Sequence, residues 1–493
     1  MSKNRIVELT AVSAIALLVF AFFCSLSLTL PIHVDEGLWG AVGKIWVKYH
    51  RPPLVGSMEN KNIFLYILYA WSYVFNLGVI PPRIIGSLCI SLTGLCIWRI
   101  AGNAGLRSSG IAAMLAFCLS RAWATHDGMY PSYTETYTCL MTAASILILT
   151  EHRWKQNTFS AFIAGLSLGI GVGFRQTAIS ALPVLLIAAF DKKNTRAENM
   201  SRLSMVLLGT AAISAASFAM YASCGIPFEV LIKDGPWSFF GNAQNVELQL
   251  NTGLSLLTDT RMILCILCTV LFAALRGIET KTRVLICAWS AVELFTGAST
   301  LKFWSHNFFP FMAASSLPLA ACVTIAIKSM RPFQERTVTF LSVIFMTLLM
   351  FPYITLTQWK SFDRGMSSEQ IIAQWIDTHS APTEKVFMMT ISGPAVVYFM
   401  NREPVGRFTT THFVSTERLG KEFKRVFTEE KPALIVFQNI SPFPENPTRQ
   451  KYTSTIYGDI DKNYTPVFTN GWHVVLRRND TFAKQTANGE TLQ

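Results

Sequence analysis

Residues 31–62, PIHVDEGLWGAVGKIWVKYHRPPLVGSMENKN, separate a first long apolar run, Leu9–Leu30, from a second, Ile63–Leu77. Asp35 and Glu36 follow the first run within a few residues. Ionised carboxylates beside a membrane span cost free energy unless they face water or a polar cavity. The stretch therefore predicts a membrane protein whose first outer loop carries a polar, water-accessible site.

The same loop also contains Glu59 and, two positions later, Lys61. Carboxylates with a nearby cation at a membrane surface are more typical of a reaction centre than of a solvated loop. An ordinary exposed loop is the alternative interpretation, in which Glu59 and Lys61 pair only to satisfy each other's charge. We carry both interpretations forward and favour the reaction centre.

The composition also indicates a membrane protein. Of the 493 residues, 51% are hydrophobic and only 15% are charged, whereas soluble chains are about a quarter charged. The net charge of +12 arises largely in short links between apolar runs, as the positive-inside rule predicts, so it does not argue for nucleic acid. All cysteines except Cys224 lie in apolar runs, which predicts no disulfide framework. We interpret Leu9–Leu30 as a retained signal anchor.

Twelve apolar runs are candidates for membrane helices. They are 9–30, 63–79, 84–98, 110–124, 134–150, 158–174, 177–190, 203–223, 261–275, 284–301, 307–327 and 337–356. We assume that all the basic links are cytoplasmic. The number of apolar runs between successive links then agrees with the number of membrane crossings required, except between residues 31 and 99. There, two apolar runs must supply a single crossing. The simplest solution places 63–79 along the outer face. This predicts a polytopic α-helical protein with about 11 transmembrane helices (range about 10–13), the amino terminus inside and the carboxyl terminus outside.

This topology brings the charged and polar loop residues to one side of the membrane. Scattered loop charges would fall on either side at random, so their common placement predicts a single water-accessible site at the outer surface. The residues and the segment placed there are Asp35, Glu36, Glu59, Lys61, His126, Asp127, Arg175, the loop 224–260, Lys302 and His306.

The chain after residue 356 is polar and free of cysteine. We expect two domains, a transmembrane domain over 1–356 and a soluble extracytoplasmic α/β domain over 357–493, because helical and strand patterns alternate in the second region. The predicted elements are strands at 386–389 and 433–437, helices at 367–378 and 415–427, and a hairpin around Asn470-Gly471.

Several stretches together resemble the GT-C superfamily of membrane glycosyltransferases, in particular the branch with protein O-mannosyltransferases and lipid A aminoarabinose transferases. The resemblance covers about residues 1 to 330. Its motifs are Asp35-Glu36 with Trp39-Gly40, similar to a D-E motif; Glu59 to Tyr66, similar to E-K-P-P-L-x-Y-W without the prolines; Pro82-Arg83-Ile84; Gly165 to Gly169 with Arg175 to Ala178, similar to G-x-x-x-G…K-x-T; and Lys302 to Pro310, similar to H-Y-x-x-P.

The resemblance implies a glycosyltransferase that uses a polyprenyl-phosphate sugar donor and a glycolipid, glycan or protein acceptor. It implies that Asp35 is the base for the acceptor hydroxyl, with Glu36 as the runner-up. Cations facing the departing phosphate would stabilise its charge, and the candidates are Lys61, Arg83 and Arg175. An inverting transfer of a hexosyl or pentosyl group is the expected reaction.

Further residues have weaker assignments. Asp127 with His126 offers two ligands for a divalent cation, too few for a site, and a capping or solvated role is the alternative. Lys302 and His306 lie at a span end, where substrate contact and a structural bond are both open. In the aminoarabinose branch, zinc is held by residues that would correspond here to His306 and Glu59. The aromatic loop 224–260 is a candidate substrate loop.

Two other functions compete with glycosyl transfer. A transporter or flippase of a lipid-linked or anionic substrate would place charge near the bilayer midplane, and Glu293 is the buried acid that suits it. A non-catalytic assembly or sensor protein would act through its outer domain. The expected location is a bacterial-type inner or plasma membrane, with the site on the extracytoplasmic face.

Overall fold

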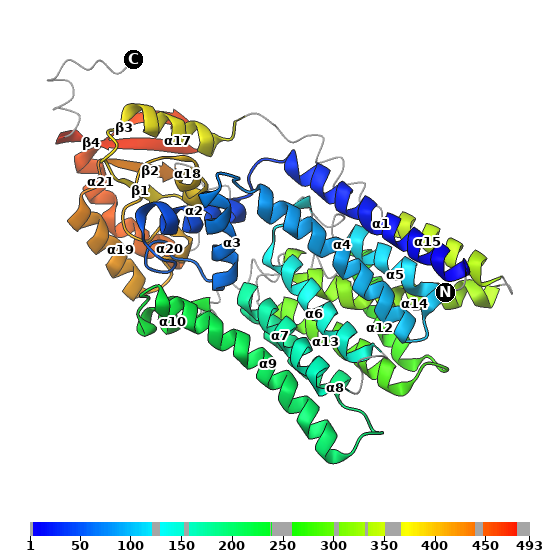
Figure 1. The fold of residues 1–493 in the computed structure, drawn as a ribbon. Helices are drawn as coiled ribbons and strands as arrows, with labels where there is room; N and C mark the ends of the chain where they lie inside the picture. The colour runs from blue at the N-terminus through cyan, green and yellow to red at the C-terminus, as the bar shows by residue number, and fades with distance from the viewer. Residues whose placement is uncertain are drawn as a thin grey trace. The chain divides into compact units, whose positions relative to one another are not determined.

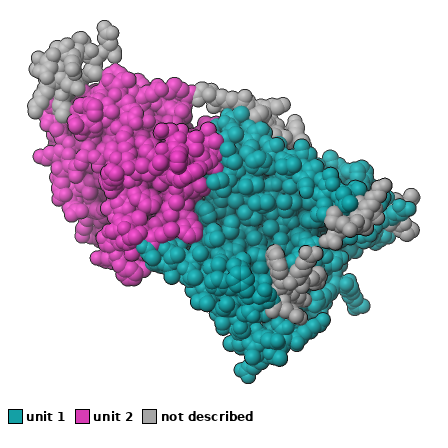
Figure 2. All heavy atoms as spheres, viewed as in Figure 1, with its two compact units in different colours: residues 1–30, 82–219, 246–362 teal, residues 31–81, 220–245, 363–493 magenta. Residues whose placement is uncertain are grey.

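The computed structural model describes residues 3–120, 129–151, 157–236, 238, 259–299, 305–330, 334–350, 366–438 and 447–480. Over these residues the chain is mostly helical, with one four-stranded sheet in its carboxyl-terminal part. The chain divides into two compact units, coloured separately in Figure 2. Unit 1 comprises Met1–Leu30, Pro82–Ala219 and Val246–Phe362, and unit 2 comprises Pro31–Pro81, Met220–Asn245 and Asp363–Gln493.

Unit 1 is built from helices, labelled in Figure 1. They are α1 (Lys3–Leu28), α4 (Ile80–Asn103), α5 (Arg107–Ser120), α6 (Thr134–Thr150), α7 (Thr158–Phe174), η2 (Gln176–Ala181), α8 (Leu182–Ala189), α9 (Arg196–Ser223), α12 (Thr260–Ala274), α13 (Thr280–Ser299), η4 (Ser305–Phe308), α14 (Phe309–Met330) and α15 (Glu335–Leu349). The expected apolar runs 134–150 and 158–174 coincide with α6 and α7.

Four helices in the described part of the chain are long and apolar enough to cross a membrane. They are Ile6–Leu28, Ile80–Asn103, Arg196–Ser223 and Ser305–Met330, and five shorter apolar helices accompany them. A membrane core about 30 Å thick needs about 20 apolar residues in a helix. The helices thus support a membrane-embedded α-helical unit.

The helix α3 (Ile63–Val74) belongs to unit 2 and has 12 residues. At 1.5 Å per residue it is about 18 Å long, short of the roughly 30 Å core. Its end is followed by two residues in the left-handed region, Asn76 (φ 54°) and Gly78 (φ 60°), which turn the chain away. That the second apolar run lies along the outer face without crossing the bilayer stays a prediction.

The sheet of unit 2 has the strand order β1-β2-β4-β3. Its strands are β1 (Val386–Met389), β2 (Leu434–Gln438), β3 (Tyr464–Asn470) and β4 (His473–Arg478). β1 and β2 are parallel, whereas β2–β4 and β4–β3 are antiparallel. Gly471 (φ 59°) adopts the left-handed conformation that the two-residue hairpin requires. The predicted strands and hairpin are present.

Helices and loops cover both faces of this sheet (Figure 1). The helices of unit 2 besides α3 are α2 (Val34–Tyr49), α10 (Phe228–Asp234), α17 (Ser368–His379), α18 (Gly393–Phe399), η5 (Thr411–Phe413), α19 (Glu417–Glu430), α20 (Pro447–Thr453), η6 (Ser454–Ile456) and α21 (Tyr457–Asn463). Along β1, Val386 and Met388 face a core made with α2, α17 and α18, and Phe387 and Met389 face a core made with α19.

The segment 31–62 therefore shares a hydrophobic core with the carboxyl-terminal sheet. Ala41 and Ile45 of α2 are fully buried in the core that contains Val386 and Leu434. Met58, at the other end of the loop, lies in the opposite core with Phe387. The expected boundary at residue 357 stays a prediction, and the compact unit that holds the sheet also includes residues from before it.

Candidate functional site

Asp35 and Glu36 occupy the first turn of α2, where their surroundings differ sharply. The Glu36 side chain is buried, and its Oε2 accepts a hydrogen bond from the His33 backbone at 3.0 Å, which closes a capping box. The Asp35 side chain is 36% exposed. Asp35 Oδ2 lies 3.9 Å from His33 Nδ1, which accepts the Asp35 backbone N–H at 3.2 Å. The Glu36 side chain thus has a structural role in the cap of α2, and the Asp35 carboxylate remains partly exposed.

Glu59 and Lys61 lie just before α3, and hydrogen bonds hold this part of the loop. The Glu59 side chain is buried and accepts the Asn60 backbone N–H at 2.8 Å. The backbone N–H of Lys61 donates to the hydroxyl of Tyr66 at 3.0 Å, and its carbonyl accepts from the hydroxyl of Tyr221 at 3.2 Å. The Lys61 ammonium lies 3.5 Å from Asn60 Oδ1 and is half-buried. The loop fixes the backbone of Lys61.

Arg83 lies in the first turn of α4, where it is only 2% exposed. Its Nη1 donates to the carbonyls of Ser27 and Leu30, at the end of α1, with 3.0 Å to Leu30. The guanidinium carbon is 5.4 Å from the centre of the Tyr130 ring. Terminal carbonyls of a helix need such partners, so these contacts give Arg83 a structural role beside the predicted phosphate contact.

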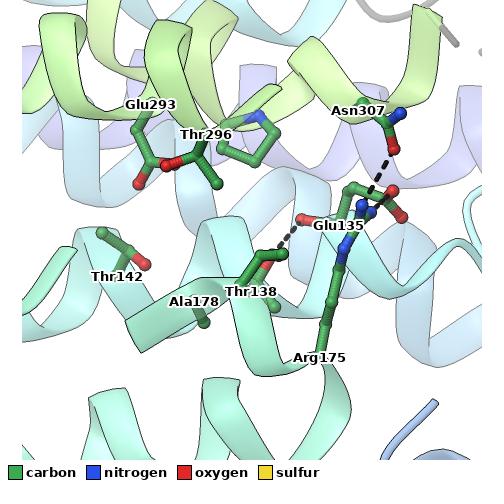
Figure 3. Close-up of a pocket in the computed structure, with 10 residues that line it drawn as sticks. Glu135, Thr138, Thr142, Arg175, Ala178, Glu293, Thr296 and Asn307 are labelled. Atoms are coloured by element: carbon green, nitrogen blue, oxygen red, sulfur yellow. Dashed lines mark hydrogen bonds and ion pairs between the residues drawn. The ribbon is translucent and has the colours of Figure 1, made fainter. Parts of the chain in front are cut away.

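A small polar cavity of about 10 Å³ lies among α6, η2, α13 and η4 of unit 1, a volume close to that of a single water site. Figure 3 shows Glu135, Arg175 and Asn307 pointing toward one another at its edge. Arg175 forms an ion pair with Glu135, and its Nη2 donates to Asn307 Oδ1 at 2.9 Å. The side chains of Arg175 and Glu135 are 11% and 3% exposed. The remaining lining residues are Thr138, Thr142, Thr177, Ala178, Glu293, Thr296 and Pro310.

His306 belongs to the same cluster. Its ring stacks on Tyr133 with 4.5 Å between centroids and 15° between planes, and its Nε2 is 3.8 Å from Glu135 Oε1. Glu135 Oε2 also accepts from the Thr134 hydroxyl at 2.8 Å. Glu135 thus faces a cation, an imidazole and a hydroxyl at once.

The described residues do not form a recognisable metal centre. No group of three or more His, Cys, Asp or Glu side chains among them is placed to hold an ion. The zinc pair implied by the resemblance divides between the units, with Glu59 in unit 2 and His306 in unit 1. Zinc held by Glu59 and His306 stays a prediction, and we derive no chemical step through a metal ion.

The predicted site residues fall into two sets. Asp35, Glu36, Glu59 and Lys61 lie in unit 2, and Arg83, Arg175 and His306 lie in unit 1. Convergence of the two sets in one cleft stays a prediction. Asp127, His126 and Lys302 lie outside the described residues, as does most of the loop 224–260.

The start of that loop is described, and its acid Asp234 is 4% exposed. Asp234 pairs with Arg407 at 2.8 Å and with Arg418. Arg407 in turn pairs with Glu422 at 2.7 Å. Since these charges are matched in a buried network, the contacts favour a structural role for Asp234.

Sequence reasoning missed two charged residues that the structure makes prominent. Glu135 opens α6 next to the segment that holds Asp127, and an acid at the start of an apolar run is the signal that could have identified it. Lys44 lies inside α2 and is 2% exposed. Its position directly after Gly43 carries no motif, so only the packing identifies it.

No protein-family model matches the sequence, and no curated protein matches it. Solved structures do. ArnT from Cupriavidus metallidurans, bound to undecaprenyl phosphate, matches with a TM-score of 0.62 at 12% identity, over 95% of this chain and 97% of that one.

Two further solved structures also match. The archaeal oligosaccharyltransferase AglB from Archaeoglobus fulgidus, in complex with an inhibitory peptide and a dolichol-phosphate, has a TM-score of 0.54 at 9% identity, over 92% of this chain and 72% of that one. Arabinofuranosyltransferase AftD from Mycobacteria has a TM-score of 0.58 at 13% identity, over 94% of this chain and 41% of that one. The chain therefore shares the fold of these three proteins, in agreement with the resemblance noted in its sequence.

Proposed function

We propose that this chain is a membrane glycosyltransferase that moves one sugar from a polyprenyl-phosphate donor to a glycolipid, glycan or protein acceptor. The observation that carries the proposal is the extent of the fold match, which covers 95% of this chain and 97% of ArnT, a protein solved with undecaprenyl phosphate. AglB was solved with a dolichol-phosphate. Two proteins of this fold thus hold a polyprenyl phosphate.

Asp35 is the proposed base, because its carboxylate is exposed while that of Glu36 is engaged in the cap of α2. The carboxylate takes the proton of the acceptor hydroxyl as its oxygen attacks the anomeric carbon. The bond from that carbon to the phosphate oxygen breaks, and polyprenyl phosphate leaves with the electron pair. Such a single displacement inverts the anomeric centre of the transferred hexosyl or pentosyl group.

The leaving phosphate gains negative charge, so cations that face it lower the barrier. Lys61, Arg83 and Arg175 are the proposed contacts. The Lys61 ammonium lies beside the Asn60 amide oxygen and is half-buried, Arg83 donates to main-chain carbonyls, and Arg175 pairs with the carboxylate of Glu135. Each of the three would have to exchange a present partner for the phosphate.

The proposed topology has about eleven spans, with the transfer site and the sheet of unit 2 on the extracytoplasmic face of a bacterial-type inner or plasma membrane. The basic links between apolar runs support this orientation through the positive-inside rule. Lipid-linked donors and a cell-envelope acceptor are consistent with that side.

The test is an assay of the purified protein in detergent with a panel of radiolabelled polyprenyl-phosphate sugars. Asp35→Asn should lower kcat by about 10²–10⁴-fold, because general-base catalysis contributes that much, and should leave donor binding intact. Asp461→Asn, an exposed acid in α21, is the matched control and should behave as wild type. Absence of transfer from every donor, or full activity of Asp35→Asn, would overturn the proposal. The same assay with EDTA, then with added Zn²⁺, tests the predicted divalent cation.

A transporter or flippase is the second candidate, and Glu293 is the observation that favours it. This acid of α13 is 4% exposed and lines the cavity beside Arg175, and buried acids in membrane helices often mark transport pathways. In vesicles, a flippase would lose lipid translocation in Glu293→Gln and keep it in Asp35→Asn. A glycosyltransferase would show the opposite dependence in sugar transfer.

A further inference from the structure

Helix α2, which carries Asp35, packs closely against two neighbouring helices. The contacts are made at Gly37, Gly40 and Gly43, and their spacing of three residues places these glycines along one side of α2. A Cβ atom on Gly37 would lie 3.0 Å from Ala395 of α18, and one on Gly40 would lie 2.5 Å from the Tyr398 ring. A Cβ on Gly43 would lie 2.7 Å from the backbone of α3. A larger residue at these positions would force its neighbour to shift, so the glycines allow α2 to pack closely against α18 and α3.

A buried lysine adds a polar attachment to this packing. The ammonium of Lys44 donates to the carbonyls of Val397 at 3.1 Å and Tyr398 at 2.9 Å, and to that of Met400. These carbonyls lie at the end of α18, where the helix leaves its last acceptors without intrahelical donors and where cations interact favourably with the dipole. Burial lowers the pKa of Lys44 to about 7, in keeping with an ammonium that has been taken out of water.

The other end of the loop is attached to the same carboxyl-terminal region. The Met58 backbone donates to the Arg407 carbonyl at 2.7 Å, and Arg407 Nη1 donates to the Leu54 carbonyl at 3.1 Å. The hydroxyls of Ser57 and Thr409 are 3.1 Å apart. Residues 393–409 thus contact the loop near Asp35 and again next to Glu59.

We propose that this carboxyl-terminal segment positions the proposed base, and that Lys44 is the positioning residue that ties the helix bearing Asp35 to α18. The inference rests on the proposed function, in which Asp35 takes the acceptor proton. A shift of about 1 Å in a reacting group can cost about a hundredfold in rate. The sheet region is in this view part of the reaction centre, and a change at its α18 contact alters turnover.

The experiment compares Lys44→Met with Lys462→Met in the whole chain. Lys462 is an exposed lysine of α21, outside the segment that contacts α2. Lys44→Met should lower kcat at least tenfold and change the donor KM less than twofold, Lys44→Arg should recover part of the loss, and Lys462→Met should match wild type. Unchanged kcat in Lys44→Met, with or without a lower melting temperature, would overturn the proposal.

A second pair of variants keeps the test decisive if Lys44→Met does not fold. Gly40→Ala places a methyl group against Tyr398, and Gly40→Ala with Tyr398→Ala removes the obstacle. The single variant should lose kcat and the double variant should regain it; no recovery would count against positioning. Hydrogen exchange of the α2 amides, measured without substrate, tests the attachment of α2 to α18 independently of the proposed glycosyltransferase activity. Faster exchange in Lys44→Met supports the attachment even if no sugar donor is turned over, and unchanged exchange contradicts it.

Discussion

At the scale of single residues, the buried charge of Arg175 is balanced by a neighbouring acid. Arg175 is a predicted phosphate contact, and in the structure it pairs with the carboxylate of Glu135, with both side chains nearly inaccessible to water. An ion pair in such surroundings has no net charge to offer an anion. A phosphate can bind to Arg175 strongly only if it displaces Glu135 or if that acid is neutralised.

Glu135→Gln tests this balance. Removing one partner of a buried pair leaves an uncompensated charge and costs about 3–5 kcal/mol, so the melting temperature should fall. The unpaired Arg175 should at the same time bind undecaprenyl phosphate more tightly. Thr142→Val, in the same cavity, is the control and should change neither quantity. Weaker or equal lipid binding by Glu135→Gln in a direct titration would show that Arg175 does not face the phosphate.

The sequence identifies Asp35 and Glu36 as candidate acids, but it could not show that the Glu36 carboxylate caps α2 while that of Asp35 does not. The capping box that engages Glu36 has histidine as its N-cap in place of the usual serine or threonine, so no pattern identifies it. Lys44 was missed for a different reason. Its acceptors are main-chain carbonyls more than 350 residues away, and such a contact leaves no local signal.

At the scale of elements, local patterns were informative where the partner is also local. The runs at 134–150 and 158–174, the strand at 386–389 and the hairpin at Asn470-Gly471 were predicted with the observed or nearly the observed bounds. The role of α2 as a core element of the sheet region could not be predicted. Its amphipathic pattern shows that one face is buried, and it does not show against what.

His473, at the start of β4, makes the stability of the sheet region depend on pH. It is fully buried, with Nε2 2.6 Å from the Ser392 hydroxyl and Nδ1 3.1 Å from that of Ser368. Ser368 donates to the Asn470 carbonyl, so Nδ1 carries the proton and Nε2 accepts from Ser392. Burial lowers the pKa of His473, which keeps the ring neutral.

Because the folded pKa lies below the unfolded value of about 6.5, the unfolded chain binds more protons below that pH. The free energy of unfolding should therefore fall as pH drops from about 6.5 toward the folded pKa, by at most about 1.4 kcal/mol per pH unit. Denaturation of the wild type at several pH values measures the slope, and His473→Gln should remove it. The exposed His50, replaced by Asn, should leave it unchanged; a slope that survives in His473→Gln would assign the effect to other groups.

At the scale of the whole molecule, the sequence predicted a helical membrane protein with an α/β region near its carboxyl end, and the fold agrees. What could not be predicted is the grouping of the first outer loop with that region in one compact unit. The contacts involved join residues 44 and 397, or 58 and 407, and nothing in the intervening apolar runs records them.

The orientation of the chain yields a prediction at this scale. Thr465→Cys on β3 and Lys193→Cys in the basic link before α9 are both exposed positions. In intact cells, a membrane-impermeant maleimide should modify the first and spare the second, because the basic link is expected on the cytoplasmic side. Signals are read against the parent protein, which has ten cysteines of its own. Labelling of Lys193→Cys in sealed cells would show that the basic link faces outward, contrary to the predicted topology.

The attachment of α2 to α18 also has a consequence for how the protein is made. When Lys44 is translated, the carbonyls that will bind it are still 353 or more residues away along the chain. Until those are translated, the apolar side of α2 has no sheet to cover it, and contacts so distant in sequence form slowly. Nascent chains should therefore stay inert and vulnerable to proteases for most of their synthesis. Maturation is then a late, concerted event in which the sheet and the earliest loop fold together.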